Sequence, residues 1–300
     1  MIEVNLLGTG GMVPLPERYL TALAVRYSGD VILIDCGEGT QMAMRAQGVP
    51  LGRVGCICIT HFHADHIAGL PGLLLTVGNA ERTEPLTIIG PKHIGKVADC
   101  LRIIAPQLPY EIRYLEIEAG GEIFRVGDLM ISAQEVEHRI PCYAYRLELP
   151  RRGRFLAEEA QKQGIPVRYW SILQRGEAIE LDGRIIPPDD FTGDARKGLK
   201  LCYATDLRPG DALAEFVRDA DLFVCEGMYG DPKLLEKAEK RRHCMMSEAA
   251  QMAKQAGVHE LWLTHFSPSM PKPKEWLHVA AQIFPNSHVD RKYAELRFEG

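Results

Sequence analysis

The segment His61-Phe62-His63-Ala64-Asp65-His66 follows directly on the apolar run Val54 to Thr60, and it constrains the fold more than any other part of the chain. His61 and His63 are two positions apart, so on an extended backbone their side chains leave the same face. The side chains of the adjacent residues Asp65 and His66 point in different directions, so they can reach a second metal ion. Imidazole nitrogens combined with a carboxylate oxygen suit zinc, manganese or iron(II). The spacing therefore predicts a buried strand whose end provides ligands for two neighbouring metal ions.

The alternative for this cluster is a purely structural role. A lone histidine at the end of an apolar strand is usually a core or surface residue. Here three histidines and an aspartate lie within six residues, behind a run that is expected to be buried. Such a cluster would be costly to desolvate without a metal, so the metal interpretation is favoured.

The composition is that of an ordinary globular protein, with 46% hydrophobic and 25% charged residues in a chain of 300. This length gives enough core for one large domain or two small ones. No apolar run approaches the roughly 20 residues of a membrane helix, and Met1 to Asn5 lacks the features of a secretory signal. We therefore expect a cytoplasmic protein with no membrane partner. The net charge of −5 gives no global sign of nucleic-acid binding, so any surface for a polyanion must be local.

The cysteine pattern predicts reduced, buried side chains rather than disulfides or zinc knuckles. No two cysteines form a CxxC pair, and most lie in apolar runs such as Cys56-Ile57-Cys58-Ile59. The cysteines are Cys36, Cys56, Cys58, Cys100, Cys142, Cys202, Cys225 and Cys244.

Strand-like and helix-like segments alternate along both halves of the chain. Short apolar or alternating runs predict strands over residues 2–7, 22–27, 31–35, 54–60, 86–90, 112–118, 121–126, 129–137, 143–149, 200–205, 222–226 and 261–264. Helix signals lie over 41–47, with Thr40 as the N-cap, and near 70–77, 94–105 and 247–256. Gly8-Thr9-Gly10-Gly11 predicts a turn at which the backbone approaches another group closely. The alternation favours a layered α/β domain with helices covering the sheet faces.

The stretch from Pro150 to about Ala195 breaks this alternation, and we interpret it as an inserted arm. Its basic residues are Arg151, Arg152, Arg154, Lys162, Arg168 and Arg175. They can simply lie on a solvated insertion, or they can neutralise the backbone phosphates of a nucleic acid. Tyr169 and Trp170 are interleaved with these basic residues. They can stack on a base or pack the arm together, and the sequence does not decide between these roles.

Three more candidate ligands, His138, Asp206 and His265, each lie at the end of an apolar run, as His61 does. All of them could therefore gather at one edge of a sheet. Each is weak on its own, because many strand-end histidines are structural. Together they are enough to complete two coordination shells.

With these residues, the chain resembles the metallo-β-lactamase-fold hydrolases, and within them the ribonuclease Z family, endonucleases that trim the 3′ trailer from precursor tRNA. The resemblance covers almost the whole chain. Besides the candidate ligands, it is carried by Leu7-Gly8-Thr9-Gly10, Asp35-Cys36-Gly37-Glu38-Gly39-Thr40-Gln41, Gly69-Leu70-Pro71-Gly72-Leu73-Leu74 and Leu263-Thr264-His265-Phe266-Ser267-Pro268.

The resemblance implies an α/β fold, the αββα four-layer sandwich of the metallo-β-lactamase fold, with a dimetal site at one edge of the sheets. A single domain would span residues 1–300, with the arm of approximately residues 150–195 inserted as a flexible exosite. The family chemistry is cleavage of a phosphodiester by a metal-activated water, and it leaves a 3′-OH on the tRNA. The implied cofactors are two Zn²⁺ ions per subunit, for which Mn²⁺ or Fe²⁺ can substitute. The implied partners are precursor tRNA and a second subunit in a homodimer.

The resemblance also implies roles for individual residues. One zinc would be held by His61, His63 and His138, and the other by Asp65, His66 and His265, with Asp206 bridging both. Asp35 would orient a ligand ring from behind. Catalysis would use Asp65 as proton acceptor, with Glu226 and His243 assisting the leaving oxygen. Arg151, Arg152, Arg154, Lys162, Arg168 and Arg175 would bind the tRNA.

Departures from the family pattern keep other functions open. The bridging aspartate lies in Thr205-Asp206-Leu207, the later loops read Cys225-Glu226-Gly227-Met228 and His243-Cys244-Met245, and the arm has only a weak Gly/Pro-rich stretch at Gly164-Ile165-Pro166. One alternative is a phosphodiesterase of the same fold that acts on small or cyclic phosphodiesters. A thioester or lactam hydrolase leaves Glu226, His243 and the arm without a purpose. A non-catalytic binding module conflicts with the full ligand set.

Overall fold

The computed structural model describes residues 1–118 and 121–298, and it divides the chain into two compact units. The first unit consists of Met1–Glu148 and Lys200–Gly300, and the second of Leu149–Leu199. Of the domain expected over residues 1–300, positions 119, 120, 299 and 300 lie outside the described residues.

The first sheet of the first unit has the strand order β16-β1-β2-β3-β4-β5-β6. Its strands are β1 (Ile2–Gly8), β2 (Ala22–Tyr27), β3 (Asp30–Ile34), β4 (Val54–Cys58), β5 (Leu86–Gly90), β6 (Ile112–Glu116) and β16 (Tyr293–Leu296). The strands β1 to β3 pair antiparallel, whereas β3 to β6 run parallel. The carboxyl ends of β3 and β4 therefore meet at one edge of this sheet.

The second sheet has the order β15-β14-β13-β12-β9-β8-β7. Its strands are β7 (Gly121–Val126), β8 (Leu129–Val136), β9 (Cys142–Arg151), β12 (Arg196–Ala204), β13 (Leu222–Glu226), β14 (Glu260–Thr264) and β15 (Ser287–His288). Here β12, β13 and β14 are parallel neighbours, so their carboxyl ends also share one edge. The two sheets are in contact, because the Tyr145 hydroxyl donates to the Ile59 carbonyl at 2.7 Å and Tyr143 N–H to the Thr60 carbonyl at 3.1 Å.

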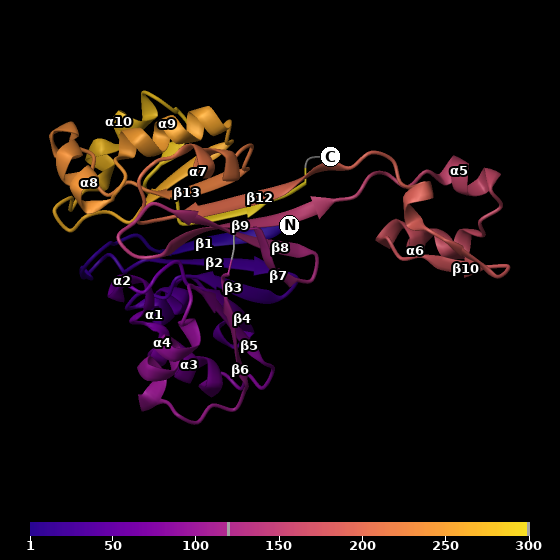
Figure 1. Ribbon diagram of the computed structural model, residues 1–300, viewed down its shortest axis with the longest axis horizontal. Coiled ribbons are helices and arrows are strands. Elements are labelled where there is room, and N and C mark those ends of the chain that lie inside the picture. Colours follow the sequence, from indigo (N-terminus) through magenta and orange to yellow (C-terminus); the bar gives the residue numbers. More distant parts are fainter. Residues whose placement is uncertain (119–120, 299–300) are drawn as a thin grey trace. The chain divides into compact units, whose positions relative to one another are not determined.

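Helices cover the outer face of each sheet (Figure 1). One apolar core joins the first sheet to α1 (Thr40–Ala46), α3 (Leu70–Asn79) and α4 (Ile94–Leu101). A second core joins the other sheet to α7 (Asp211–Phe216), α9 (Met246–Ala256) and α10 (Leu277–Ala281). Shorter elements are α2 (Ala64–Ile67), α8 (Leu235–Arg241) and the 3-10 helices Leu51–Arg53, Arg102–Ile104, Pro232–Leu234 and Pro273–Trp276. The layers therefore follow the order helix, sheet, sheet, helix, which confirms the expected α/β sandwich.

The second unit has a small core of its own. It contains α5 (Ala157–Lys162), α6 (Trp170–Arg175), β10 (Ile179–Leu181), β11 (Arg184–Ile186) and the 3-10 helices Val167–Tyr169 and Pro188–Phe191. Leu173 and Phe191 are fully buried in this core. Trp170 packs against it and donates its indole N–H to the Ile165 carbonyl at 2.9 Å. Trp170 therefore packs the arm together, which is one of the two roles left open by the sequence.

Most predicted elements are present within a few residues of their expected bounds. The assignment of Thr40 as an N-cap is wrong: Gly39, with φ of 91°, occupies that position. Thr40 begins the helix instead, and its hydroxyl donates to the Gly37 carbonyl at 2.7 Å. All eight cysteines are free, and all except Cys100 are buried. None of the described helices combines the length and hydrophobicity needed to cross a lipid bilayer.

Candidate metal centre

The candidate ligands lie on loops that leave the carboxyl ends of strands in both sheets. Asp35 follows β3 and His61 follows β4, while His138, Asp206 and His265 follow β8, β12 and β14. Asp35, Asp206 and His265 have positive φ angles of 62°, 56° and 55°. Aspartate and histidine are enriched among the residues that adopt this left-handed conformation. It turns each of these three side chains away from the line of its strand.

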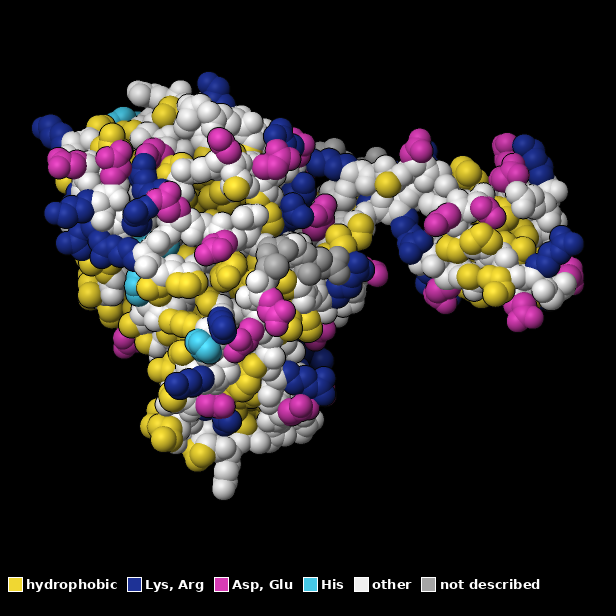
Figure 2. Space-filling view, in the orientation of Figure 1, with side chains coloured by type: hydrophobic (Ala, Val, Ile, Leu, Met, Phe, Trp, Pro, Cys, Tyr) yellow, Lys and Arg dark blue, Asp and Glu magenta, His cyan; other side chains and the backbone are white. Residues whose placement is uncertain are grey.

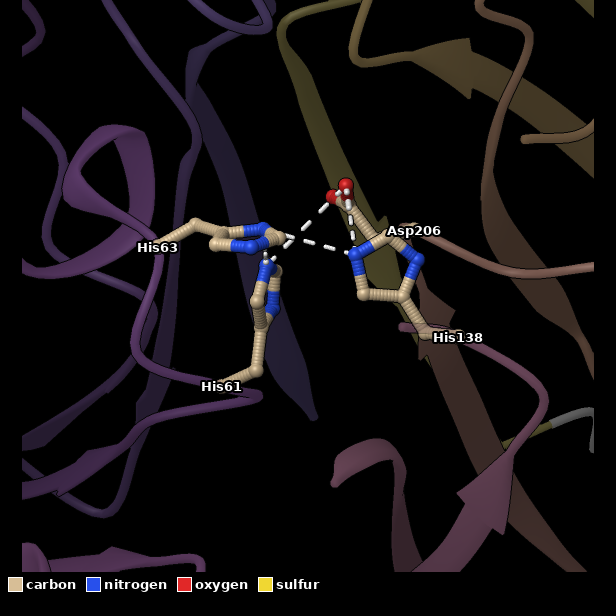
Figure 3. A group of neighbouring side chains, drawn as sticks. All are labelled: His61, His63, His138 and Asp206. Atoms are coloured by element: carbon tan, nitrogen blue, oxygen red, sulfur yellow. Dashed lines mark hydrogen bonds and ion pairs between the residues drawn. The ribbon is translucent and has the colours of Figure 1, made fainter. Parts of the chain in front are cut away.

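The first group of potential ligands consists of His61, His63, His138 and Asp206 (Figure 3). Nε2 of His61 lies 2.9 Å from Nδ1 of His63, and Nε2 of His138 lies 3.4 Å from the same nitrogen. Oδ1 of Asp206 lies 3.6 Å from Nε2 of His138 and 4.0 Å from Nε2 of His61. Ring nitrogens from two loops and a carboxylate from a third thus converge on one point.

The second group consists of Asp65, His66 and His265. Nε2 of His66 lies 3.2 Å from Nε2 of His265. Oδ2 of Asp65 lies 3.4 Å from Nε2 of His265 and 3.7 Å from Nε2 of His66. Both sheets contribute to this group, because Asp65 and His66 follow β4 whereas His265 follows β14.

Asp206 contacts the two groups with different oxygens. Its Oδ1 faces the first group, while its Oδ2 lies 2.9 Å from Nε2 of His66 and 3.0 Å from Nε2 of His265. Despite these distances, the buried Oδ2 has no partner of hydrogen-bond geometry among the described residues. An unsatisfied buried carboxylate oxygen is destabilising, and a cation would satisfy it. These residues therefore fit a dimetal site.

Asp35 and Thr60 orient the outward-facing nitrogens of two ligands. Oδ2 of Asp35 lies 2.8 Å from Nδ1 of His66. The Thr60 hydroxyl lies 3.0 Å from both carboxylate oxygens of Asp35 and 3.0 Å from Nδ1 of His61. The imidazoles of His61 and His66 are thus held with Nε2 toward the site, as is usual for metal ligands. The sequence analysis did not single out Thr60, although its position directly before His61 is a usable signal.

Glu226 has a similar position behind the second group. Its Oε1 accepts N–H groups of Leu207 at 2.7 Å and Cys244 at 3.0 Å. Its Oε2 lies 3.0 Å from Nδ1 of His243 and 3.3 Å from Nδ1 of His265. Glu226 is fully buried, and its contacts link the predicted catalytic histidine to a predicted metal ligand.

Arg208 holds the loop that carries His243. Its Nη1 donates to the His243 carbonyl at 2.6 Å, and the guanidinium forms an ion pair with Glu248. Glu248 also accepts the Met245 N–H at 2.9 Å, which fixes the start of α9.

The turn at Gly8–Gly11 approaches the site as expected. A Cβ atom added to Gly11 would lie 2.8 Å from the His265 ring, so a side chain has no room there. The next residue, Met12, donates its N–H to Oδ2 of Asp65 at 2.6 Å. The glycine turn thus contacts the second group from the side of the first sheet.

The negative charges of the buried carboxylates at the site must be balanced by protons or metal ions. Although burial opposes protonation of His66, the carboxylates of Asp35 and Asp206 raise its pKa well above the usual range. Burial is likewise outweighed at His265, where mainly Asp206 raises the pKa to about 10. Burial, followed by the charge of His66, lowers the pKa of His61. Protons on His66 and His265 would balance the carboxylates in metal-free protein, and metal ions can displace them.

A cavity of about 300 Å³ opens at the two groups. Besides candidate ligands, it is lined by Met12, Ala64, Arg139, Arg241 and His243. The two arginines are not among the residues predicted from the sequence. His243 lies at the surface of this cavity, with Glu226 behind it.

The predicted tRNA-binding residues all lie in the second unit or at its boundary with β9. Arg151, Arg152 and Arg154 lie in or directly before a segment that pairs antiparallel with residues 191–193, as in the bond from the Gly193 N–H to the Arg154 carbonyl at 2.9 Å. The Arg196 guanidinium also donates to the Arg152 carbonyl at 3.0 Å. The other three make contacts within the unit: Lys162 with Glu159, Arg168 with Tyr169, and Arg175 with Glu177.

Similarity to known proteins extends over the whole chain. A protein named Ribonuclease Z from Agathobacter rectalis is 51% identical, and one from Clostridium acetobutylicum is 44% identical, each over 100% of this chain and 99% of the relative. Residues 2–102 also match the family of the Anti-Pycsar protein Apyc1.

Solved structures support the same fold. The short form of human tRNase Z aligns with a TM-score of 0.66 and 24% identity, covering 89% of this chain and 94% of that one. The metallo-β-lactamase fold protein YhfI from Bacillus subtilis aligns with a TM-score of 0.68 and 19% identity, covering 96% and 95%. Together with the dimetal site, the full-length relatives show that this chain belongs to the ribonuclease Z family and is a metal-dependent endoribonuclease of the metallo-β-lactamase fold.

Proposed function

We propose that the protein removes the 3′ trailer from precursor tRNA by hydrolysing one phosphodiester, and that it leaves a 3′-OH on the tRNA. One observation carries the proposal: members of both ligand groups and His243, which Glu226 contacts from behind, line a single cavity. A phosphodiester in this cavity would have groups for both the attacking and the leaving oxygen beside it. The name tRNase Z of a structural relative supports tRNA as the substrate.

Each ligand group would hold one metal ion, with Asp206 shared between them. Zn²⁺ suits the mixture of imidazole and carboxylate donors, and we propose two Zn²⁺ ions per subunit. Mn²⁺ and Fe²⁺ accept the same donors. The bound ions would supply a water whose pKa is about 7, so that a nucleophile is available at neutral pH.

Asp65 is placed to take the proton of the attacking water. Although burial opposes its ionisation, the His265 and His66 imidazoles hold its pKa well below the usual range. Its carboxylate is therefore ionised at neutral pH. The Met12 N–H bond to Oδ2 keeps the carboxylate oriented at the wall of the cavity.

His243 is placed to protonate the leaving oxygen. As the water oxygen bonds to phosphorus, the bond from phosphorus to the O3′ atom of the tRNA breaks, and O3′ needs a proton. The bond between Nδ1 of His243 and Glu226 leaves Nε2 of the imidazole for the substrate. The buried Glu226 carboxylate holds the His243 ring in this orientation.

A cleavage assay tests this function. Precursor tRNA with a 3′ trailer is incubated with the protein and with an Asp65→Ala variant, and the products are mapped. We expect a cut after the discriminator base, lost in the variant. Intact precursor tRNA with metal-loaded, folded wild-type protein would contradict the proposal.

We propose that the second unit holds the tRNA, as the exosite of this enzyme. Gly153 and Gly193 lie in direct backbone contact, so residues 154–192 can be replaced by an Asn-Gly turn between them. This deletion should weaken tRNA binding while sparing hydrolysis of bis(p-nitrophenyl) phosphate. Equal loss on both substrates would contradict a role in tRNA binding.

A second candidate is a phosphodiesterase for small or cyclic phosphodiesters. The weak Gly/Pro-rich stretch of the arm, Gly164-Ile165-Pro166, favours it. Hydrolysis of cyclic nucleotides by protein that leaves precursor tRNA intact would select this function.

We also propose a cytoplasmic homodimer. The free, buried cysteines support a reducing compartment. The dimer follows from the resemblance to the family, and sedimentation or light scattering of the purified protein would test it.

A further inference from the structure

Two arginines at the metal centre have no role in the chemistry described above. Arg139 directly follows His138, and Arg241 lies two residues before His243. Both side chains are exposed, and both line the cavity of about 300 Å³ together with the candidate ligands. Phosphodiester hydrolysis by two metals, Asp65 and His243 requires neither of them.

The charges of Arg139 and Arg241 are not neutralised within the described part of the chain. Arg139 donates to the Lys240 carbonyl at 3.3 Å, which leaves most of its N–H donors unused. Neither arginine forms an ion pair with a described carboxylate, whereas the neighbouring Arg242 pairs with Glu137. Figure 2 shows Lys and Arg side chains gathered at the left of the view, over the region where Figure 1 places α8. Unpaired guanidinium groups beside a cavity are suited to bind phosphate.

Their position next to His138 and His243 indicates which phosphate they would bind. In the proposed reaction, His243 protonates O3′ of the nucleotide on the 5′ side of the cut. The next phosphate on that side is the 5′-phosphate of the same nucleotide. Asp65 and the attacking water belong to the opposite side of the scissile phosphate, because displacement is in line.

We infer that Arg139 and Arg241 form a subsite for the phosphate that neighbours the scissile phosphate on its 5′ side. The choice of side rests on the role proposed for His243. A polynucleotide would occupy both this subsite and the metal centre, whereas a cyclic mononucleotide has no second phosphate to place there. The subsite would therefore favour an RNA strand over a small phosphodiester.

Inhibition by dinucleotides tests the subsite without requiring cleavage of tRNA. The metal-loaded protein hydrolyses bis(p-nitrophenyl) phosphate in the presence of ApA, pApA or ApAp, and the inhibition constants are compared. pApA should inhibit about tenfold more tightly than ApA, a ratio that corresponds to one charge-assisted hydrogen bond. In an Arg139→Ala/Arg241→Ala variant the ratio should fall to about one. An Arg45→Ala/Arg53→Ala variant removes the same charge from exposed positions outside the cavity and should keep the wild-type ratio.

Three outcomes would overturn the subsite. The first is equal inhibition by ApA and pApA. The second is a pApA advantage that survives in the Arg139→Ala/Arg241→Ala variant, which would place the extra phosphate elsewhere. The third is an arginine-dependent advantage for ApAp, which would place the contact on the 3′ side. Intact precursor tRNA combined with the predicted dinucleotide ratios would instead contradict the proposed substrate and leave the subsite standing.

Discussion

The Oε2 atom of Glu226 lies 3.3 Å from Nδ1 of His265 and 3.0 Å from Nδ1 of His243. One buried carboxylate oxygen thus contacts a ring expected to bind metal and a ring expected to move a proton. We therefore expect the two processes to be coupled through Glu226.

Substitution of Glu226 should affect both processes, whereas substitution of His243 should affect only one. Glu226→Gln should lower metal affinity about 10–100-fold, because the His265 ring loses its oriented acceptor. It should also slow cleavage. His243→Ala should lower kcat about 10²–10⁴-fold with metal content unchanged. Metal analysis and single-turnover cleavage of both variants distinguish the cases, and full metal occupancy in Glu226→Gln would refute the coupling.

Thr60→Val should weaken metal binding without unfolding the protein. The change keeps the shape of the side chain but removes the hydroxyl that contacts Asp35 and His61. We expect about a tenfold loss of metal affinity. Thr264→Val is a matched control: Thr264 directly precedes His265, is fully buried, and has a hydroxyl without a hydrogen-bond partner in the described part of the chain. Competition titration with a chelating dye should show a loss of metal affinity in Thr60→Val alone. Equal affinities of both variants would show that Thr60 does not support metal binding.

Gly11→Ala should disturb the second ligand group selectively. The new methyl group would lie 2.8 Å from the His265 ring, so either the ring or the turn must move. We expect a loss of about one bound metal per chain and a large drop in kcat. Gly210→Ala, where a Cβ would meet nothing within 4 Å, is the control. Two tightly bound metals in Gly11→Ala would show that the turn can move to accommodate the methyl group without weakening metal binding.

Metal removal should cost more stability at alkaline pH than at slightly acidic pH. The pKa of His265, about 10 in the folded protein, exceeds the value of about 6.5 for an unfolded chain. Its protonation therefore stabilises the metal-free fold fully below about pH 6.5, and this contribution is lost as the pH rises through about 10. The gap in melting temperature between metal-loaded and metal-free protein should widen from pH 6.5 to pH 9. A constant gap would show that protons do not replace the metals.

The convergence of the candidate ligands could be predicted from the sequence because parallel strands place their carboxyl ends together. His61, Asp206 and His265 could each be recognised as a polar residue that ends an apolar run. Once β4, β12 and β14 are assigned as strands of packed sheets, the convergence of these residues follows from the topology.

The remaining features depend on contacts between distant segments. Thr60 acquires its role only because Asp35, 25 residues earlier, turns toward it through a left-handed backbone. Arg139 and Arg241 become neighbours only when the loop after β8 meets the end of α8. The C-terminal strand β16 was not predicted, and it pairs with β1 from the opposite end of the chain. Local patterns carry no information about such pairings.

The hydrogen bonds behind the ligand rings have a consequence for how the enzyme is assembled. Asp35, Thr60 and Glu226 hold the imidazoles in place through protein contacts alone. We therefore expect the chain to fold first and acquire its ions afterwards, unlike a zinc finger, whose folding requires the metal. A site completed in this order takes its ions from whatever supply the cell offers at that moment. The identity of the bound metal then reflects cellular availability as much as the affinity of the protein.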